Sequence, residues 1–155
     1  MSGKQDAGPR IALLVARFNS MITGHLERAA RERLLREGIA EDRIESFHVP
    51  GAWDLPQAAQ WILSEGRHDA LIAIGCVIRG ETAHFDYVAG HASDGLGRVA
   101  LHKDTPIVFG VLTADNAEQA LARALPSGAN KGAEFAESAL SLVALRDAVW
   151  ELDEP

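Results

Sequence analysis

The stretch Ala70–Ile78, which reads ALIAIGCVI, has no polar side chain apart from one thiol. A short apolar run of this kind is typical of a buried strand. A strand without a polar face needs cover on both sides, and strands in parallel sheets have such cover. The stretch therefore predicts a strand inside a parallel sheet with helices on both faces.

Strand and helix patterns alternate on both sides of this stretch. The other predicted strands are Ile11–Ala16, Ile44–Val49 and Ile107–Leu112. The predicted helices are Met21–Glu37, Ala52–Glu65, His84–His102, Asn116–Leu125 and Lys131–Leu152. Asn19 and Ser20 are good N-cap residues for the first helix, whereas Gly90, Gly95 and Gly97 weaken the third. The alternation predicts an α/β fold, namely a flavodoxin-like, three-layer αβα sandwich around a four-stranded parallel sheet in the order 2-1-3-4.

Composition narrows the class of protein. The chain has 155 residues, 47% hydrophobic and 24% charged, with a formal net charge of -7. This predicts a single globular domain over residues 10–155 after a flexible N-terminal arm over residues 1–9. The acidic balance argues against a nucleic-acid partner. The lone cysteine, Cys76, fits a reducing compartment. Without a signal-like or membrane-length apolar segment, we expect a cytoplasmic protein with no membrane partner.

Unusual residues cluster where the predicted strands end. They fall in the segments 17–19, 49–56, 75–87 and 109–113. In a parallel sheet the carboxyl ends of the strands meet at one edge, and ligands of such folds bind outside that edge. The sequence therefore predicts a ligand site there.

The segment after the apolar stretch could bind a phosphate group. Gly80 and Thr82 precede a predicted helix, so backbone N–H groups and a hydroxyl could face an anion. A plain connecting turn is the competing interpretation, and the charge of Glu81 would repel phosphate unless it points away. His84 begins the helix and is a candidate proton carrier. The other histidines are interpreted as surface or packing residues.

Aromatic and basic residues complete the set of candidate ligand-site residues. Phe18, Trp53 and Phe109 are placed at strand ends and could stack on a planar heterocycle, although core packing is the commoner role of such residues. Arg123 and Lys131 flank a helix break and are either solvated charges or a clamp for an anion. Cys76 is interpreted as a buried, inert thiol, and no cluster in the sequence has the spacing of metal ligands.

At these residues the chain closely resembles the lumazine synthase family. The matching motifs are RFN at 17–19, VPGAWDLP at 49–56, GCVIRGETAHFDYV at 75–88, PIVFGVLT at 106–113, EQA at 118–120 and NKG at 130–132. The resemblance implies a riboflavin biosynthesis enzyme. Enzymes of this family condense 5-amino-6-(D-ribitylamino)uracil with 3,4-dihydroxy-2-butanone 4-phosphate, giving 6,7-dimethyl-8-ribityllumazine, phosphate and water. It also implies that no cofactor or metal is needed, and that riboflavin synthase is a functional partner.

The resemblance assigns roles to individual residues. Phe18 would stack on the pyrimidine, His84 would donate and accept the proton, and Glu81 and Thr82 would hold the phosphate substrate with Arg123 as charged partner. The remaining pyrimidine-site residues would be Ala52, Trp53, Asp54, Cys76, Val77, Ile78, Phe109 and Lys131. Family sites lie between subunits of a pentamer, so Phe109, Arg123 and Lys131 would come from the neighbouring subunit.

Two departures from the family pattern stand out. Asp54 replaces the usual Glu, which keeps the carboxylate but shortens its reach. The segment 125–129, LPSGA, replaces the start of the motif that capsid-forming members carry, which puts shell formation in doubt. Two alternatives stay open. One is a family member that binds flavin or forms a shell without catalysis. The other is a flavodoxin-like FMN carrier, which the segment 17–20 disfavours because it lacks a phosphate loop.

Overall fold

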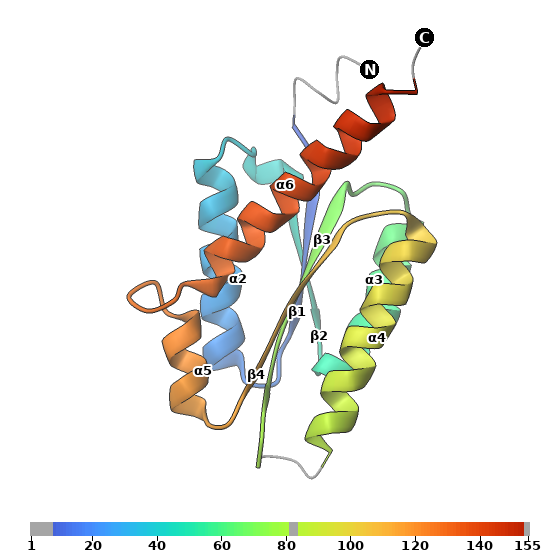
Figure 1. The fold of residues 1–155 in the computed structure, drawn as a ribbon. Coiled ribbons are helices and arrows are strands. Elements are labelled where there is room, and N and C mark those ends of the chain that lie inside the picture. The colour runs from blue at the N-terminus through green and yellow to red at the C-terminus, as the bar shows by residue number, and fades with distance from the viewer. Residues whose placement is uncertain (1–7, 81–83, 154–155) are drawn as a thin grey trace.

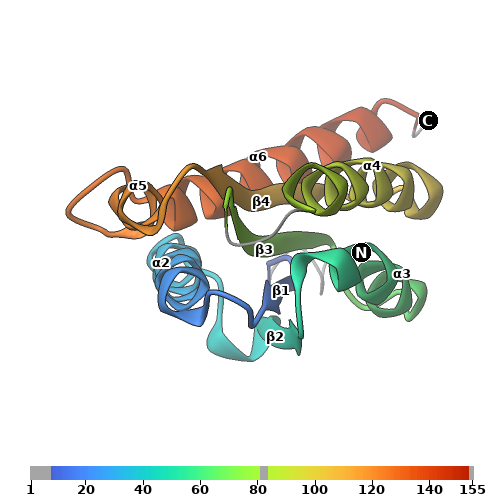
Figure 2. The same cartoon turned by 90° about the horizontal axis from the view of Figure 1, so that it is seen from below.

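A computed structural model describes residues 8–80 and 84–153, in which two layers of helices enclose a single sheet (Figures 1 and 2). The strands are β1 (Ile11–Ala16), β2 (Ile44–Val49), β3 (Ala70–Ile78) and β4 (Ile107–Ala114). The helices are α2 (Ser20–Arg36), α3 (Leu55–Ser64), α4 (Phe85–Lys103), α5 (Ala117–Ala124) and α6 (Lys131–Glu151). Short 3-10 turns cover Glu41–Arg43 (η1) and Ala52–Asp54 (η2).

The sheet is parallel and has the order β2-β1-β3-β4, which confirms the predicted fold class. Three predicted strands have the predicted bounds, whereas β4 runs on to Ala114. The helix predicted from Ala52 begins as the 3-10 turn η2, and α3 proper starts at Leu55. Its Pro56 stands in the first turn, where a missing N–H costs no hydrogen bond.

Alternating side chains of the strands form two separate cores. From β1, Ile11, Leu13 and Val15 pack with residues of α2, α5 and α6. Ala12, Leu14 and Ala16 pack on the other face with residues of α3 and α4. Figure 2 shows these two groups of helices on opposite sides of the sheet. Every residue of β3 is buried, as expected for a strand with helices on both faces.

Helix α4 is continuous despite its three glycines, so the predicted weakness does not interrupt it. A Cβ atom built on Gly95 would lie 2.7 Å from both Cβ and Cγ of Pro56 in α3. Gly95 therefore allows the two helices to approach closely, and their packing compensates for its poor helix propensity.

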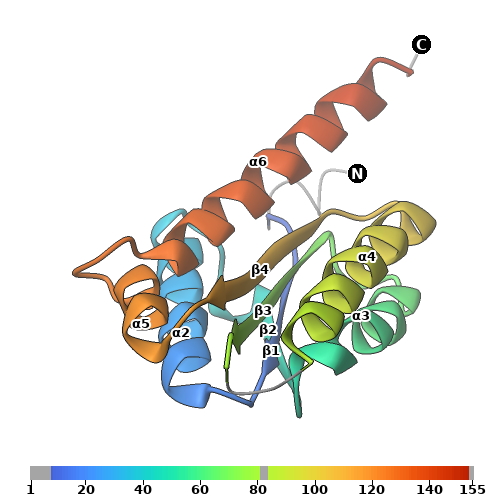
Figure 3. The ribbon, with the colours of Figure 1, turned by 60° about the horizontal axis from the view of Figure 1, so that its bottom comes forward.

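Helix α6 crosses the sheet and extends beyond it (Figure 3). Arg146 anchors this part by donating from Nη1 to the Asp69 carbonyl oxygen at 3.0 Å and from Nη2 to Asp69 Oδ1 at 3.3 Å. The same guanidinium lies 4.8 Å from the centre of the Trp150 ring. Within residues 8–80 and 84–153, no helix has the length and apolar character needed to cross a membrane.

Candidate functional site

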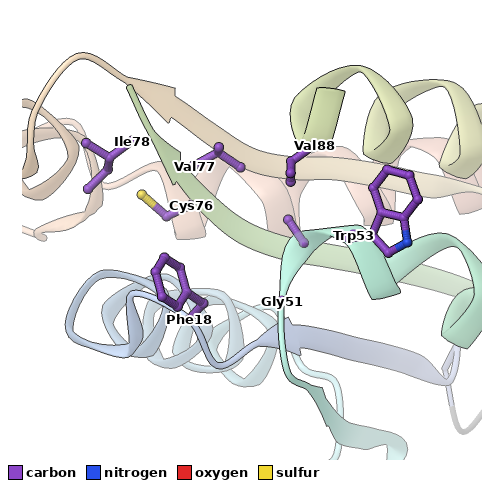
Figure 4. A pocket seen from close by; sticks show the side chains of 8 residues that line it. Phe18, Gly51, Trp53, Cys76, Val77, Ile78 and Val88 are labelled. Atoms are coloured by element: carbon purple, nitrogen blue, oxygen red, sulfur yellow. The ribbon is translucent and has the colours of Figure 1, made fainter. Parts of the chain in front are cut away.

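A pocket of about 260 Å³ opens at the carboxyl ends of β1, β2 and β3 (Figure 4). The lining residues follow β1 and β2, form the end of β3, or belong to α4. They are Phe18, Gly51, Ala52, Trp53, Cys76, Val77, Ile78 and Val88. This edge of the sheet is where the sequence predicts a ligand site. Apart from backbone groups and one thiol, the walls are apolar, which suits the face of a planar ring.

The pocket exists because β1 ends before β3 does. The ladder between these strands stops at the pair Val15 and Ile74, whereas β3 runs on to Ile78. The chain turns away after Ala16, and Phe18 follows with 60% of its surface exposed. Figure 4 shows the Phe18 ring facing Cys76 across the pocket. Phe18 is therefore not part of the hydrophobic core, and its ring is available to a ligand.

The 3-10 turn η2 forms the second wall. Gly51 and the buried Ala52 bring backbone to the pocket surface, because neither carries a large side chain. Asp54 is not a lining residue, and its Oδ2 accepts a hydrogen bond of 3.0 Å from the Gly51 N–H. The carboxylate that the family resemblance assigns to substrate binding therefore also fixes the turn that positions Gly51 and Ala52.

Trp53 lies at the opposite end of the pocket from Phe18 (Figure 4). Its indole stacks on His91 of α4, with ring centroids 3.7 Å apart and an interplanar angle of 21°. Sequence reasoning missed this pair, since His91 was interpreted as a surface or packing residue. The sequence feature that could have pointed to His91 is its spacing from His84. Residues seven apart are two helical turns apart and therefore lie on the same face of a helix.

The start of α4 brings His84 near the pocket. His84 is the exposed N-cap residue of α4, and its carbonyl accepts a 2.9 Å hydrogen bond from the N–H of Val88, which lines the pocket. Its ring centroid lies 6.3 Å from that of Tyr87. Val88 and Gly51 are lining residues that the sequence did not single out. Glu81 and Thr82, the predicted phosphate ligands, lie outside the described residues.

Arg79 is a cation at this edge that the sequence analysis did not single out. Its guanidinium lies 4.5 Å from the centre of the Phe85 ring, and Nε lies 3.5 Å from Asp115 Oδ1. Its backbone N–H donates to the Ala114 carbonyl oxygen at 2.8 Å, which joins the ends of β3 and β4. The sequence feature that could have identified Arg79 is its position directly after the last residue of β3.

Arg123 belongs to α5, and its side chain contacts the end of β4. Its Nη1 donates to the carbonyl oxygen of Thr113 at 2.8 Å, and Thr113 pairs with Val77 in the sheet. Lys131, the first residue of α6, places Nζ 3.0 Å from Glu134 Oε2. Neither basic residue lines the pocket of its own chain.

The predicted position of Phe109 at a strand end is wrong. Phe109 is the third residue of β4 and pairs with Ala73, in the middle of β3. Phe109 is also the third residue of the predicted strand Ile107–Leu112, so its placement at a strand end did not follow even from the predicted bounds. Phe109 is 43% exposed and does not line the pocket of its own chain.

Cys76 is 3% exposed and lines the pocket, as do Val77 and Ile78. The buried thiol agrees with its predicted environment inside an apolar strand. In the described ranges 8–80 and 84–153, no group of three His, Cys, Asp or Glu residues has the arrangement of a metal site.

A comparison with protein families finds a match that covers almost the whole chain. The family model described as 6,7-dimethyl-8-ribityllumazine synthase matches residues 8–147 of this 155-residue chain. The matched range contains every residue that lines the pocket.

Proposed function

Since this chain belongs to the 6,7-dimethyl-8-ribityllumazine synthase family, an enzyme family of riboflavin biosynthesis, we propose that it makes that lumazine. Its substrates would be 5-amino-6-(D-ribitylamino)uracil and 3,4-dihydroxy-2-butanone 4-phosphate. The amine of the uracil condenses with the ketone and releases one water, phosphate leaves, and closure of the second ring releases another water.

The observation that carries this proposal is the apolar pocket at the carboxyl edge of the sheet. The exposed Phe18 ring faces the buried end of β3 across the pocket, and a flat pyrimidine could stack on this ring. Backbone groups of residues 76–78 and of the turn at 51–52 can supply the few polar contacts that orient a ring. The ribityl chain then extends toward Trp53 and Asp54.

The phosphate substrate is proposed to bind beside the start of α4. Backbone N–H groups at a helix N-terminus favour an anion, and the segment with Glu81 and Thr82 immediately precedes this helix. Arg123 supplies a guanidinium that can bind phosphate through two parallel hydrogen bonds. His84, at the N-cap of α4, would carry the protons that the condensation and the phosphate elimination release and consume.

A homo-oligomer built from pentamers is part of the proposal, with each reaction site shared by two neighbours. Phe109, Arg123 and Lys131 do not line the pocket of their own chain, yet each belongs to the expected site. A head-to-tail contact would bring these residues of one subunit to the pocket of the next, and repetition of that contact can close a ring. No metal or cofactor enters the proposed reaction.

Turnover of the two substrates tests the proposal. Purified chain mixed with both compounds should form product with the absorbance and fluorescence of the lumazine, at a rate proportional to protein and well above the uncatalysed reaction. Omission of either substrate gives the baseline, and an added chelator should not change the rate. Binding of riboflavin or lumazine without product formation would instead favour a non-catalytic flavin-binding or shell-forming protein.

A further inference from the structure

Asn19 has an unusual backbone and an unexpected hydrogen bond. It lies directly after Phe18, and its φ of 67° and ψ of 42° place it in the left-handed region, which few residues other than glycine adopt. Although it is the N-cap residue of α2, its side chain makes no capping bond. Instead, Nδ2 donates to the Cys76 carbonyl oxygen at 2.9 Å, in a partly buried setting. The expected capping role of its side chain is therefore wrong.

This hydrogen bond links the segment after β1 to β3 beyond the point where the ladder between the two strands ends. The ladder between β1 and β3 ends at the pair Val15 and Ile74, so the hydrogen bond between Asn19 and Cys76 lies two residues beyond that end of the ladder. The Asn19 amide supplies the donor there. On the other side, the N–H groups of Arg17 and Phe18 donate to the carbonyl oxygens of Val49 and Pro50, at 2.8 and 3.0 Å. Residues 17–19 thus join β2 through backbone bonds and β3 through one side chain.

We propose that Asn19 is a positioning residue that sets the width of the pyrimidine slot. Phe18 forms one wall of the slot and Cys76 the other, and the Asn19 amide links the backbone beside both walls. The left-handed backbone directs the side chain to β3 while the Asn19 carbonyl accepts from the N–H groups of Ile22 and Thr23, which starts α2. This inference rests on the proposed function, because it assigns the slot to the pyrimidine.

Three variants separate the amide from the backbone around it. Asn19→Asp keeps the size and the tolerance of left-handed backbone but turns an oxygen toward the Cys76 carbonyl. Asn19→Gly removes the side chain and relieves the backbone. Ser20→Ala is the control, since Ser20 is exposed and begins the same helix. Far-UV circular dichroism and the thermal midpoint establish that each variant is folded.

The readout is the contrast between the two substrates. Loss of one hydrogen bond that holds a binding wall should raise the KM and the Kd of the pyrimidine about three- to tenfold in both Asn19 variants. The KM of the butanone phosphate should change less than about twofold, and Ser20→Ala should match the unaltered chain. A merely structural defect would weaken both substrates alike.

Failure of this inference differs from failure of the proposed function. Unchanged pyrimidine Kd in folded Asn19→Asp and Asn19→Gly, or equal weakening of both substrates, overturns the role of Asn19 while leaving the reaction intact. If the unaltered chain binds the pyrimidine without turnover, the reaction is wrong, and the Kd values of the variants still decide the role of Asn19. If the unaltered chain binds no pyrimidine, both proposals fail.

Discussion

The contact between α3 and α4 depends on the absence of a side chain at Gly95, and its replacement by alanine is a sharp test. A Cβ on Gly95 would lie 2.7 Å from two carbon atoms of the Pro56 ring, a distance that real Cβ contacts do not show. Gly97, on the same helix, has nothing within 4 Å of the corresponding position. The pair Gly95→Ala and Gly97→Ala therefore compares the same chemical change with and without a steric neighbour.

The two substitutions should have different effects on the free energy of unfolding. Alanine in a helix interior is favoured over glycine by about 0.5–1 kcal/mol, so Gly97→Ala should stabilise the fold by about this amount. Gly95→Ala has the same gain but must displace a rigid ring, and overpacking costs about 1–3 kcal/mol. The two variants should therefore differ by about 1–3 kcal/mol in the free energy of unfolding, with Gly95→Ala the less stable.

Denaturant unfolding followed by circular dichroism measures this difference. All variants are compared at one protomer concentration, because association contributes to the stability of an oligomer. Gly90→Ala, also without a neighbour within 4 Å, serves as a second control. A Gly95→Ala variant as stable as Gly97→Ala would refute the close packing of α4 on α3.

Three further predictions concern individual side chains. His84→Ala should slow turnover by about 10- to 10⁴-fold without abolishing it, because holding two reactive substrates together already accelerates the reaction; unchanged steady-state turnover would remove its assigned role. Arg123→Lys should raise the KM of the phosphate substrate far more than that of the pyrimidine, since an ammonium cannot form two parallel bonds; equal effects on both constants would refute the assignment. Arg146→Met should lower the unfolding free energy by about 1–2 kcal/mol, because the Asp69 contacts are largely shielded from water; a denaturation curve that does not shift would show that the α6 anchor contributes nothing.

Local patterns were enough to predict the sheet. The strand Ala70–Ile78 is apolar on both faces and needs cover on both, so its sequence alone indicates a parallel sheet. Turn residues such as Gly38 and Pro50 bound the first helix and the second strand. The end of β4 was placed too early, because Thr113 and Ala114 continue the ladder only through pairing with Val77 and Ile78.

The candidate site was predicted less completely, because it depends on contacts between distant segments. The stack of Trp53 on His91 joins η2 to α4, and no local spacing relates these residues. Asn19 has the residue type of an N-cap, yet its amide bonds to Cys76 because β1 ends early. Residue type suggested ring stacking for Phe109 and anion binding for Arg123 and Lys131, but only the resemblance placed them in the site of a neighbouring subunit. None of them lines the pocket of its own chain, so those roles remain predictions.

Mixed oligomers test the shared reaction site most directly. His84→Ala removes a residue on the pocket side of the proposed site, and Arg123→Ala removes one on the neighbour side. The two variant chains are unfolded together in equal amounts and refolded. Random association in a ring should then leave both halves of the site intact in about a quarter of the sites. The predicted result is turnover at about a quarter of the unaltered rate, which is above the rate of either variant refolded alone. A mixture no more active than its separate components would contradict a site shared between two chains.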